Sequence, residues 1–141
     1  MPALDDAQLA ALAALLGYPV PPEYVAFMAT YPPVLAAKHY PGLTRGIAEH
    51  ELFSDPARVV AANHRVRTHP TWGADGEQFW TPSHLVIGTD LSGDMIFIDS
   101  SSAAAPIQRY LVETGATITV APDVATYAAL LVNDDPSLRR S

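Results

Sequence analysis

The chain has 141 residues, of which 49% are hydrophobic and 16% charged, and this balance favours a packed core and excludes global disorder. Its net charge of −7 arises from fifteen acidic against eight basic residues, which excludes the dense cationic surface that nonspecific nucleic-acid binding needs. The chain has no cysteine, which excludes disulfides and thiolate metal sites.

We expect a single domain over residues 1–141, with a core at about 5–131 and a frayed tail at 133–141. The N-terminal end has no basic region, and the Leu- and Ala-rich stretch after it is too short to span a bilayer. A soluble cytoplasmic protein is therefore the expectation, and its acidity favours basic partners.

Two helices are predicted near the N-terminus. The first spans residues 5–16, with Asp5 or Asp6 as its N-cap and Gly17 in the left-handed position after its end. The second spans about 22–31 and starts at two prolines. Its apolar residues recur at the spacing of one helical face that must contact the core, and they are Tyr24, Phe27, Met28 and Tyr31.

The middle of the chain contains a third helix. Residues 33–48 show no regular pattern, and 49–53 form a candidate short strand. The helix begins with Asp55 as N-cap and Pro56 in the first turn and runs to about Arg67. Its buried face should comprise Val59, Ala62 or Asn63, and Val66.

This third helix is locally basic, because it carries Arg58, Arg65 and Arg67, with His69 just beyond it. One interpretation is a contact with an anion or a partner protein. The alternative is a solvated helix face that pairs with the chain's own excess of carboxylates.

A central β-hairpin is the clearest feature of the sequence. Two apolar runs, 85–88 and 95–98, flank a short polar segment in which Gly93 can adopt the positive φ of a tight reversal. Because the runs are almost continuously apolar, we expect other elements to cover both faces of these strands.

The hairpin also holds the acidic residues Asp90, Asp94 and Asp99, which could bind a divalent cation. The alternative is that Asp90 and Asp94 bond turn amides and that Asp99 ends a strand. The five histidines lack the spacing of a helical zinc pair, and no serine lies in a nucleophile-elbow sequence.

After the hairpin, we predict a turn at 100–105, strands at 107–112 and 117–120 separated by Gly115, and a last helix that begins at Pro122. The buried face of that helix should comprise Val124, Tyr127, Ala128 and Leu131. The order of elements indicates an α+β fold, in which the N-terminal helices and a C-terminal helix pack on a mainly antiparallel β-sheet.

The longest predicted loop, residues 68–83, is the best candidate for a recognition segment. It contains two tryptophans with acidic residues between them, a combination that offers apolar anchors and charges for a protein partner. The alternative is that both rings pin the loop to the core. Together with two hairpin aspartates, the candidate partner-binding residues are Trp72, Asp75, Glu77, Trp80, Asp90 and Asp94.

The order of these motifs over about residues 5–131 resembles the SMI1/KNR4 domain of the SUKH superfamily. The matching residues are Gly17, Val20-Pro-Pro-Glu-Tyr24 with Phe27, Gly88 and Asp90 with Gly93-Asp94, Phe97 and Asp99, Pro106-Ile107, and Ala121-Pro-Asp-Val-Ala-Thr-Tyr127. One departure is that the chain has Tyr31-Pro-Pro where the family often has Asn-Gly.

The resemblance implies a noncatalytic binding domain with no cofactor and no bound metal. Many bacterial members resemble immunity proteins that block a cognate toxin, so the expected partner is a toxin more basic than this chain. Two alternatives stay open: a metal-dependent enzyme or ligand-binding domain that uses Asp90 and Asp94, and a regulatory scaffold of the fungal type.

Overall fold

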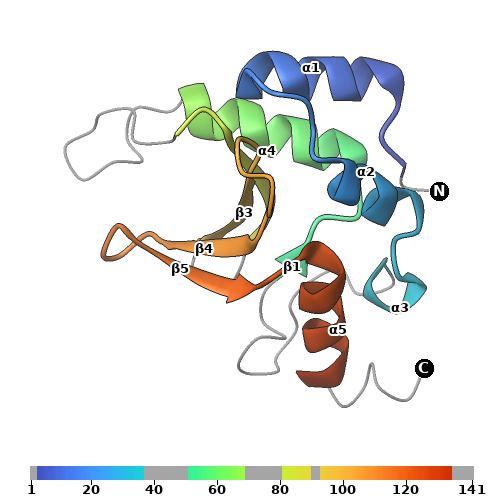
Figure 1. The fold of residues 1–141 in the computed structure, drawn as a ribbon, viewed down its shortest axis with the longest axis vertical. Helices are drawn as coiled ribbons and strands as arrows, with labels where there is room; N and C mark the ends of the chain where they lie inside the picture. Colours follow the sequence, from blue (N-terminus) through green and yellow to red (C-terminus); the bar gives the residue numbers. More distant parts are fainter. Residues whose placement is uncertain (1–2, 37–50, 69–80, 90–92, 135–141) are drawn as a thin grey trace.

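The computed structural model describes residues 3–36, 51–68, 81–89 and 93–134. Helices dominate the first half of these residues, and a run of strands followed by a helix makes up the second half (Figure 1). In chain order the elements are α1 (Asp6–Leu16), α2 (Pro22–Ala29), α3 (Pro33–Ala36), β1 (Glu51–Leu52), α4 (Pro56–Thr68), β2 (His84–Thr89), β3 (Met95–Asp99), β4 (Ile107–Leu111), β5 (Ala116–Ala121) and α5 (Val124–Asp134).

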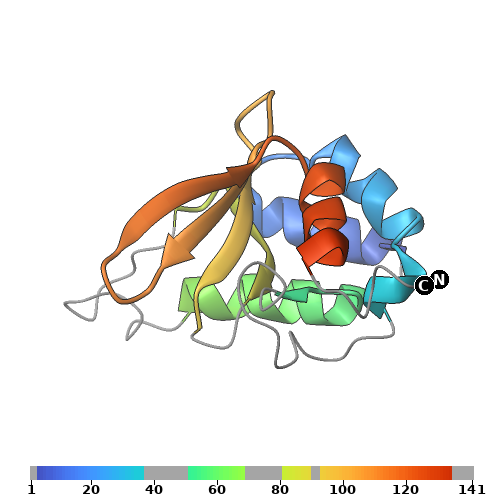
Figure 2. The ribbon, with the colours of Figure 1, turned by 90° about the horizontal axis from the view of Figure 1, so that it is seen from below.

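The five strands form one antiparallel sheet in the order β1-β2-β3-β4-β5, so that each strand lies beside its neighbours in the chain. Helices α1 and α4 lie side by side, and α4 packs against β2. Helix α5 packs against α2 and α3 at the other end of the molecule (Figure 2). This arrangement confirms the predicted α+β class with helices packed on an antiparallel sheet.

The predicted signals at the ends of α1 are confirmed. Asp5 is the N-cap, and its side chain and that of Gln8 bond each other's backbone amides in a capping box. Gly17 follows the helix with φ of 75°, a conformation that glycine adopts without the steric cost of a Cβ.

The apolar stripe of α2 faces the core as predicted. Tyr24 and Met28 are completely buried, and Phe27 and Tyr31 are 8% and 7% exposed. The Tyr31 hydroxyl donates a hydrogen bond of 2.6 Å to the carbonyl of Leu52. The stripe therefore also connects the N-terminal helices to β1, the first edge strand of the sheet.

The β2–β3 hairpin is confirmed, and its central residues are buried on both faces. Gly93 has φ of 92°, the positive value predicted for the reversal. The register of the hairpin shifts between Val86 and Gly88, so β2 contains a bulge. Asp99 ends β3, as the sequence indicated.

Some boundaries differ from the prediction. Residues 33–36 form the short helix α3, although the sequence shows no periodicity there. Helix α5 continues to Asp134 and therefore includes Asn133, which we had assigned to a frayed tail. On α4 it is Asn63, not Ala62, that is fully buried. None of the helices in the described ranges is long and apolar enough to cross a membrane.

Candidate functional site

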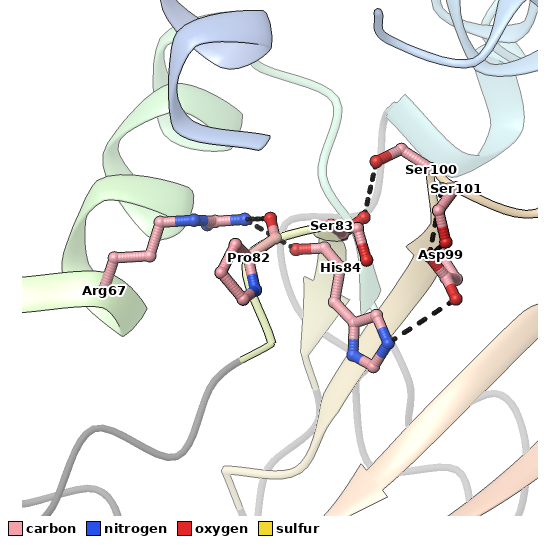
Figure 3. A network of polar contacts seen from close by, with 7 residues as sticks. All are labelled: Arg67, Pro82, Ser83, His84, Asp99, Ser100 and Ser101. Atoms are coloured by element: carbon pink, nitrogen blue, oxygen red, sulfur yellow. Dashed lines mark hydrogen bonds and ion pairs between the residues drawn. The ribbon is translucent and has the colours of Figure 1, made fainter. Parts of the chain in front are cut away.

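The main polar cluster of the described residues lies where α4 ends and β2 begins (Figure 3). At its centre the Arg67 guanidinium donates to three backbone carbonyls, those of Asn63 at 2.7 Å, Pro82 at 2.7 Å and His84 at 2.8 Å. Since Arg67 precedes residues 69–80 and Pro82 follows them, this side chain joins the two chain segments that border that stretch.

Asn63 supports Arg67 from the buried face of α4. Its amide nitrogen donates to the carbonyl of Val86, and its amide oxygen accepts from the Val86 amide, both at 2.8 Å. The side chain therefore pairs with the backbone of β2 as a neighbouring strand would, while the backbone carbonyl of Asn63 accepts from Arg67. No carboxylate contributes to these bonds, so the polar contact between α4 and β2 consists of hydrogen bonds and contains no salt bridge.

His84 and Asp99 form the second half of the cluster. They oppose each other across the β2–β3 pair, with the imidazole Nε2 3.8 Å from the Asp99 Oδ2. The His84 ring stacks on Phe97 at 4.3 Å between centroids. Asp99 Oδ1 accepts from the amide of Ser101 at 3.0 Å and from its hydroxyl at 2.6 Å.

The surroundings set the protonation of this pair. Burial lowers the pKa of His84 from 6.5, and the charge of Arg67 adds to this effect, while Asp99 opposes it. Burial raises the pKa of Asp99, but hydrogen bonds from Ser101 and Ser83 and the charge of His84 outweigh burial and leave it below 3.8. At neutral pH the pair is therefore a neutral imidazole beside a carboxylate.

The geometry does not assemble a serine nucleophile. The Ser101 hydroxyl donates to Asp99, and the Ser100 hydroxyl donates to the Ser83 carbonyl at 2.6 Å. Nucleophilic catalysis needs a hydroxyl that donates to a base, which the third group then orients. Here the Ser101 hydroxyl donates a hydrogen bond to the carboxylate with no imidazole between them, and the Ser100 hydroxyl donates to a backbone carbonyl. These bonds hold the start of β2 and the end of β3 together.

Asp94 is the one predicted partner-binding residue that the structure describes. It is 5% exposed, and its Oδ2 accepts from Arg109 on β4 at 2.7 and 3.0 Å. Its Oδ1 accepts from the backbone amide of Val112 at 3.0 Å. Asp94 therefore bonds an amide as one alternative expected, but this amide lies beyond β4 and not in the hairpin turn.

The other predicted partner-binding residues lie outside the described residues, and so does His69. They are Trp72, Asp75, Glu77, Trp80 and Asp90. In the ranges that the structure does cover, no group of three or more His, Asp or Glu side chains is arranged to hold a metal ion.

One arginine of the basic helix α4 has a role that neither predicted interpretation includes. Arg67 bonds backbone carbonyls, and the Arg58 guanidinium lies 4.6 Å from the centre of the Phe53 ring. No sequence motif indicates the Arg67 contacts, because backbone carbonyls are present at every residue. The His84–Asp99 pair depends on the register of the hairpin, which shifts by one residue at the bulge in β2, so local spacing does not predict it.

A comparison with protein-family models matches residues 3–129 to the SMI1 / KNR4 family (SUKH-1). A search of curated proteins found no match, nor did a search of solved structures. The family match covers α1 through most of α5 and thus contains the whole sheet and the polar cluster around Arg67. The chain therefore belongs to the SMI1/KNR4 family (SUKH-1).

Proposed function

We propose that this chain is an immunity protein, which binds a cognate bacterial toxin in the cytoplasm and blocks it without a reaction of its own. The observation that carries the proposal is the family match over residues 3–129. The Arg67 cluster agrees with a binding role, because its polar groups are used to fix the backbone.

The distribution of charge supports a basic partner. Two described arginines have their guanidinium groups committed inside the fold, Arg67 to backbone carbonyls and Arg109 to the buried Asp94. Exposed carboxylates of the described residues lie at Asp5, Asp6, Glu23, Asp55 and Glu113, against exposed arginines at Arg58 and Arg65. A negative surface speeds encounter with a positive partner and repels acidic ones.

We retain Trp72, Asp75, Glu77, Trp80 and Asp90 as proposed contact residues for the toxin. Arg67 and Pro82 lie on the two borders of residues 69–80 and are bonded to each other. Asp94 is not part of the proposed surface, because its carboxylate is buried and bonded to Arg109 and Val112.

Coexpression with the product of the adjacent toxin gene tests the proposal. We expect the toxin to inhibit growth alone, growth to recover when this chain is coexpressed, and the two proteins to copurify as a complex. A catalytically inactive toxin variant should still bind, because the proposed mechanism is occlusion. A neighbouring gene product that neither harms cells nor binds this chain would contradict the proposal.

A further inference from the structure

Within the described residues, β5 is an edge strand of the sheet. β5 pairs with β4 alone among the described strands, and its residues Ala116–Thr119 are exposed. Figure 2 shows the β4–β5 hairpin extending away from α2 and α5. The backbone groups on the outer side of this stretch therefore face none of the described strands.

Edge strands usually carry a device that prevents pairing with another chain, such as a lysine, a proline or a bulge. Ala116–Thr119 has no charge and no proline. The one irregularity is a register shift that leaves Val120 between the pairs Gln108–Thr119 and Ile107–Ala121. This bulge limits a further ladder to about four residues but leaves those four open.

The two faces of the open stretch differ in chemistry. Ile118 is 44% exposed and shares its face of the sheet with Arg109, its partner on β4. Thr117 and Thr119 lie on the opposite face, beside Tyr110 and Gln108. An added strand would therefore place an apolar side chain against Ile118 and polar side chains against the threonines.

The charges near the ends of β5 indicate which kind of molecule adds a strand to this edge. Glu113 precedes the strand and is exposed, and Asp123 follows it. A second copy pairing antiparallel would bring Glu113 of one chain near Asp123 of the other, in two proteins that each carry a net charge of −7. Both residues lie outside the four-residue ladder, so they act through longer-range repulsion between like charges. The edge therefore favours a basic partner with cations near these positions.

We propose that β5 is a docking edge for an extended segment of the toxin, which adds a strand beside Ala116–Thr119. The segment alternates apolar and polar side chains over about four residues and carries Lys or Arg near Glu113. Main-chain hydrogen bonds hold the segment, and its apolar side chain covers Ile118. This inference rests on the proposed function for the identity of the partner.

Paired variants test the edge. Ile118→Lys adds a charge to the open strand, and Leu130→Lys is its matched control, because Leu130 is 38% exposed on α5, away from the edge. We expect the first variant to weaken the affinity for the toxin of the adjacent gene by about tenfold or more and the control to change it by less than about threefold. Glu113→Lys should weaken binding similarly, with Glu23→Lys on α2 as control.

Hydrogen exchange gives a second readout that a change in fold would not mimic. With unchanged thermal midpoints for all variants, the wild-type complex should show newly protected amides within Ala116–Thr119, and the Ile118→Lys mixture should not. Wild-type binding that Ile118→Lys leaves intact would overturn the docking edge and leave the proposed function standing. Equal losses in the control would also overturn it.

Two outcomes concern the identity of the occupant. A dimer of the free protein that Ile118→Lys dissociates would show that a second copy occupies the edge, and would overturn the proposal. If the wild-type protein does not bind the toxin at all, the proposed function is wrong. The toxin segment is then also wrong as the partner of the β5 edge.

Discussion

Asn63 shows how one buried side chain can replace a strand. Its amide group donates to the carbonyl of Val86 and accepts from the amide of the same residue. A side-chain amide presents a donor and an acceptor about as far apart as those of a peptide group, so α4 gains a backbone-like contact with β2. An apolar residue at this position would fill the space but leave two buried backbone groups unpaired.

Asn63→Ala should therefore lower the free energy of unfolding by roughly 2–4 kcal/mol, because it leaves both Val86 groups unsatisfied in a buried site. Urea unfolding followed by circular dichroism measures the change. His64→Ala is the control, since His64 is the next residue on α4 and is exposed. A loss for Asn63→Ala no larger than that for the control would show that water replaces the amide.

The protonation of His84 makes the fold sensitive to mild acid. Because burial lowers the pKa of His84 below 6.5 in the folded chain, the unfolded chain takes up a proton first as the pH falls. The free energy of unfolding should then decrease as the pH falls from about 6.5 to the lower pKa that His84 has in the folded chain. Below that pKa, His84 causes no further decrease.

Urea midpoints measured between about pH 7.5 and pH 5 test this sensitivity. His84→Gln should flatten the decline, because the glutamine does not titrate, whereas His64→Gln on the exposed side of α4 should leave it unchanged. An identical pH profile for wild type and His84→Gln would contradict the expected role of His84.

Among the elements, those with a strong hydrophobic period were predicted well. The stripes of α2 and α5 and the apolar runs of β2 and β3 all face the core as expected. Helix α3 has four residues, too few to show a helical period, so sequence reasoning missed it. The sequence left open whether Ala62 or Asn63 is buried, because the partner that makes Asn63 buriable is 23 residues away.

The candidate site was less predictable than the fold. Its central residue Arg67 bonds carbonyls of Pro82 and His84, and no sequence motif marks a backbone acceptor. Asp94 was recognised as a residue of interest, but its partner Arg109 is on another strand, so the pair depends on the sheet register. A register that follows from tertiary packing cannot be read from local spacing.

Asp94 connects the start of β3 to β4 and to the residue after it. Asp94→Asn should lower the free energy of unfolding by roughly 2–4 kcal/mol, because it leaves the Arg109 guanidinium and the Val112 amide without their charged acceptor. Thermal or urea unfolding measures the loss, and Glu113→Gln at an exposed position is the control. Equal stability of both variants would mean that solvent screens the Asp94–Arg109 pair.

At the scale of the whole molecule, the net charge of −7 and the exposed carboxylates of the described residues favour a basic partner. Affinity for a basic toxin should therefore weaken as salt is added, by roughly tenfold between about 50 mM and about 500 mM NaCl. Calorimetric titration at several salt concentrations measures the trend. An affinity independent of salt would indicate apolar contacts alone and contradict the charge argument.

The strand order has a kinetic consequence. From β2 to β5 each strand pairs with its successor across a short turn, so this part of the sheet can form by successive local closures with little loss of chain entropy. β1 is different, because Leu52 pairs with Gly88 and is fastened by the distant Tyr31. We expect β1 to join after the rate-limiting barrier is crossed.

Tyr31→Phe removes the hydroxyl that fastens β1 and should cost about 1 kcal/mol. If β1 joins late, this loss appears as faster unfolding with an unchanged folding rate, and stopped-flow measurements in urea separate the two. Tyr18→Phe at an exposed position should change neither rate. A slower folding rate for Tyr31→Phe would place β1 in the folding nucleus instead. If β1 joins the sheet last, it is also the strand that leaves first during unfolding. Its release would then expose the edge of β2 long before the strands β2 to β5 separate from one another.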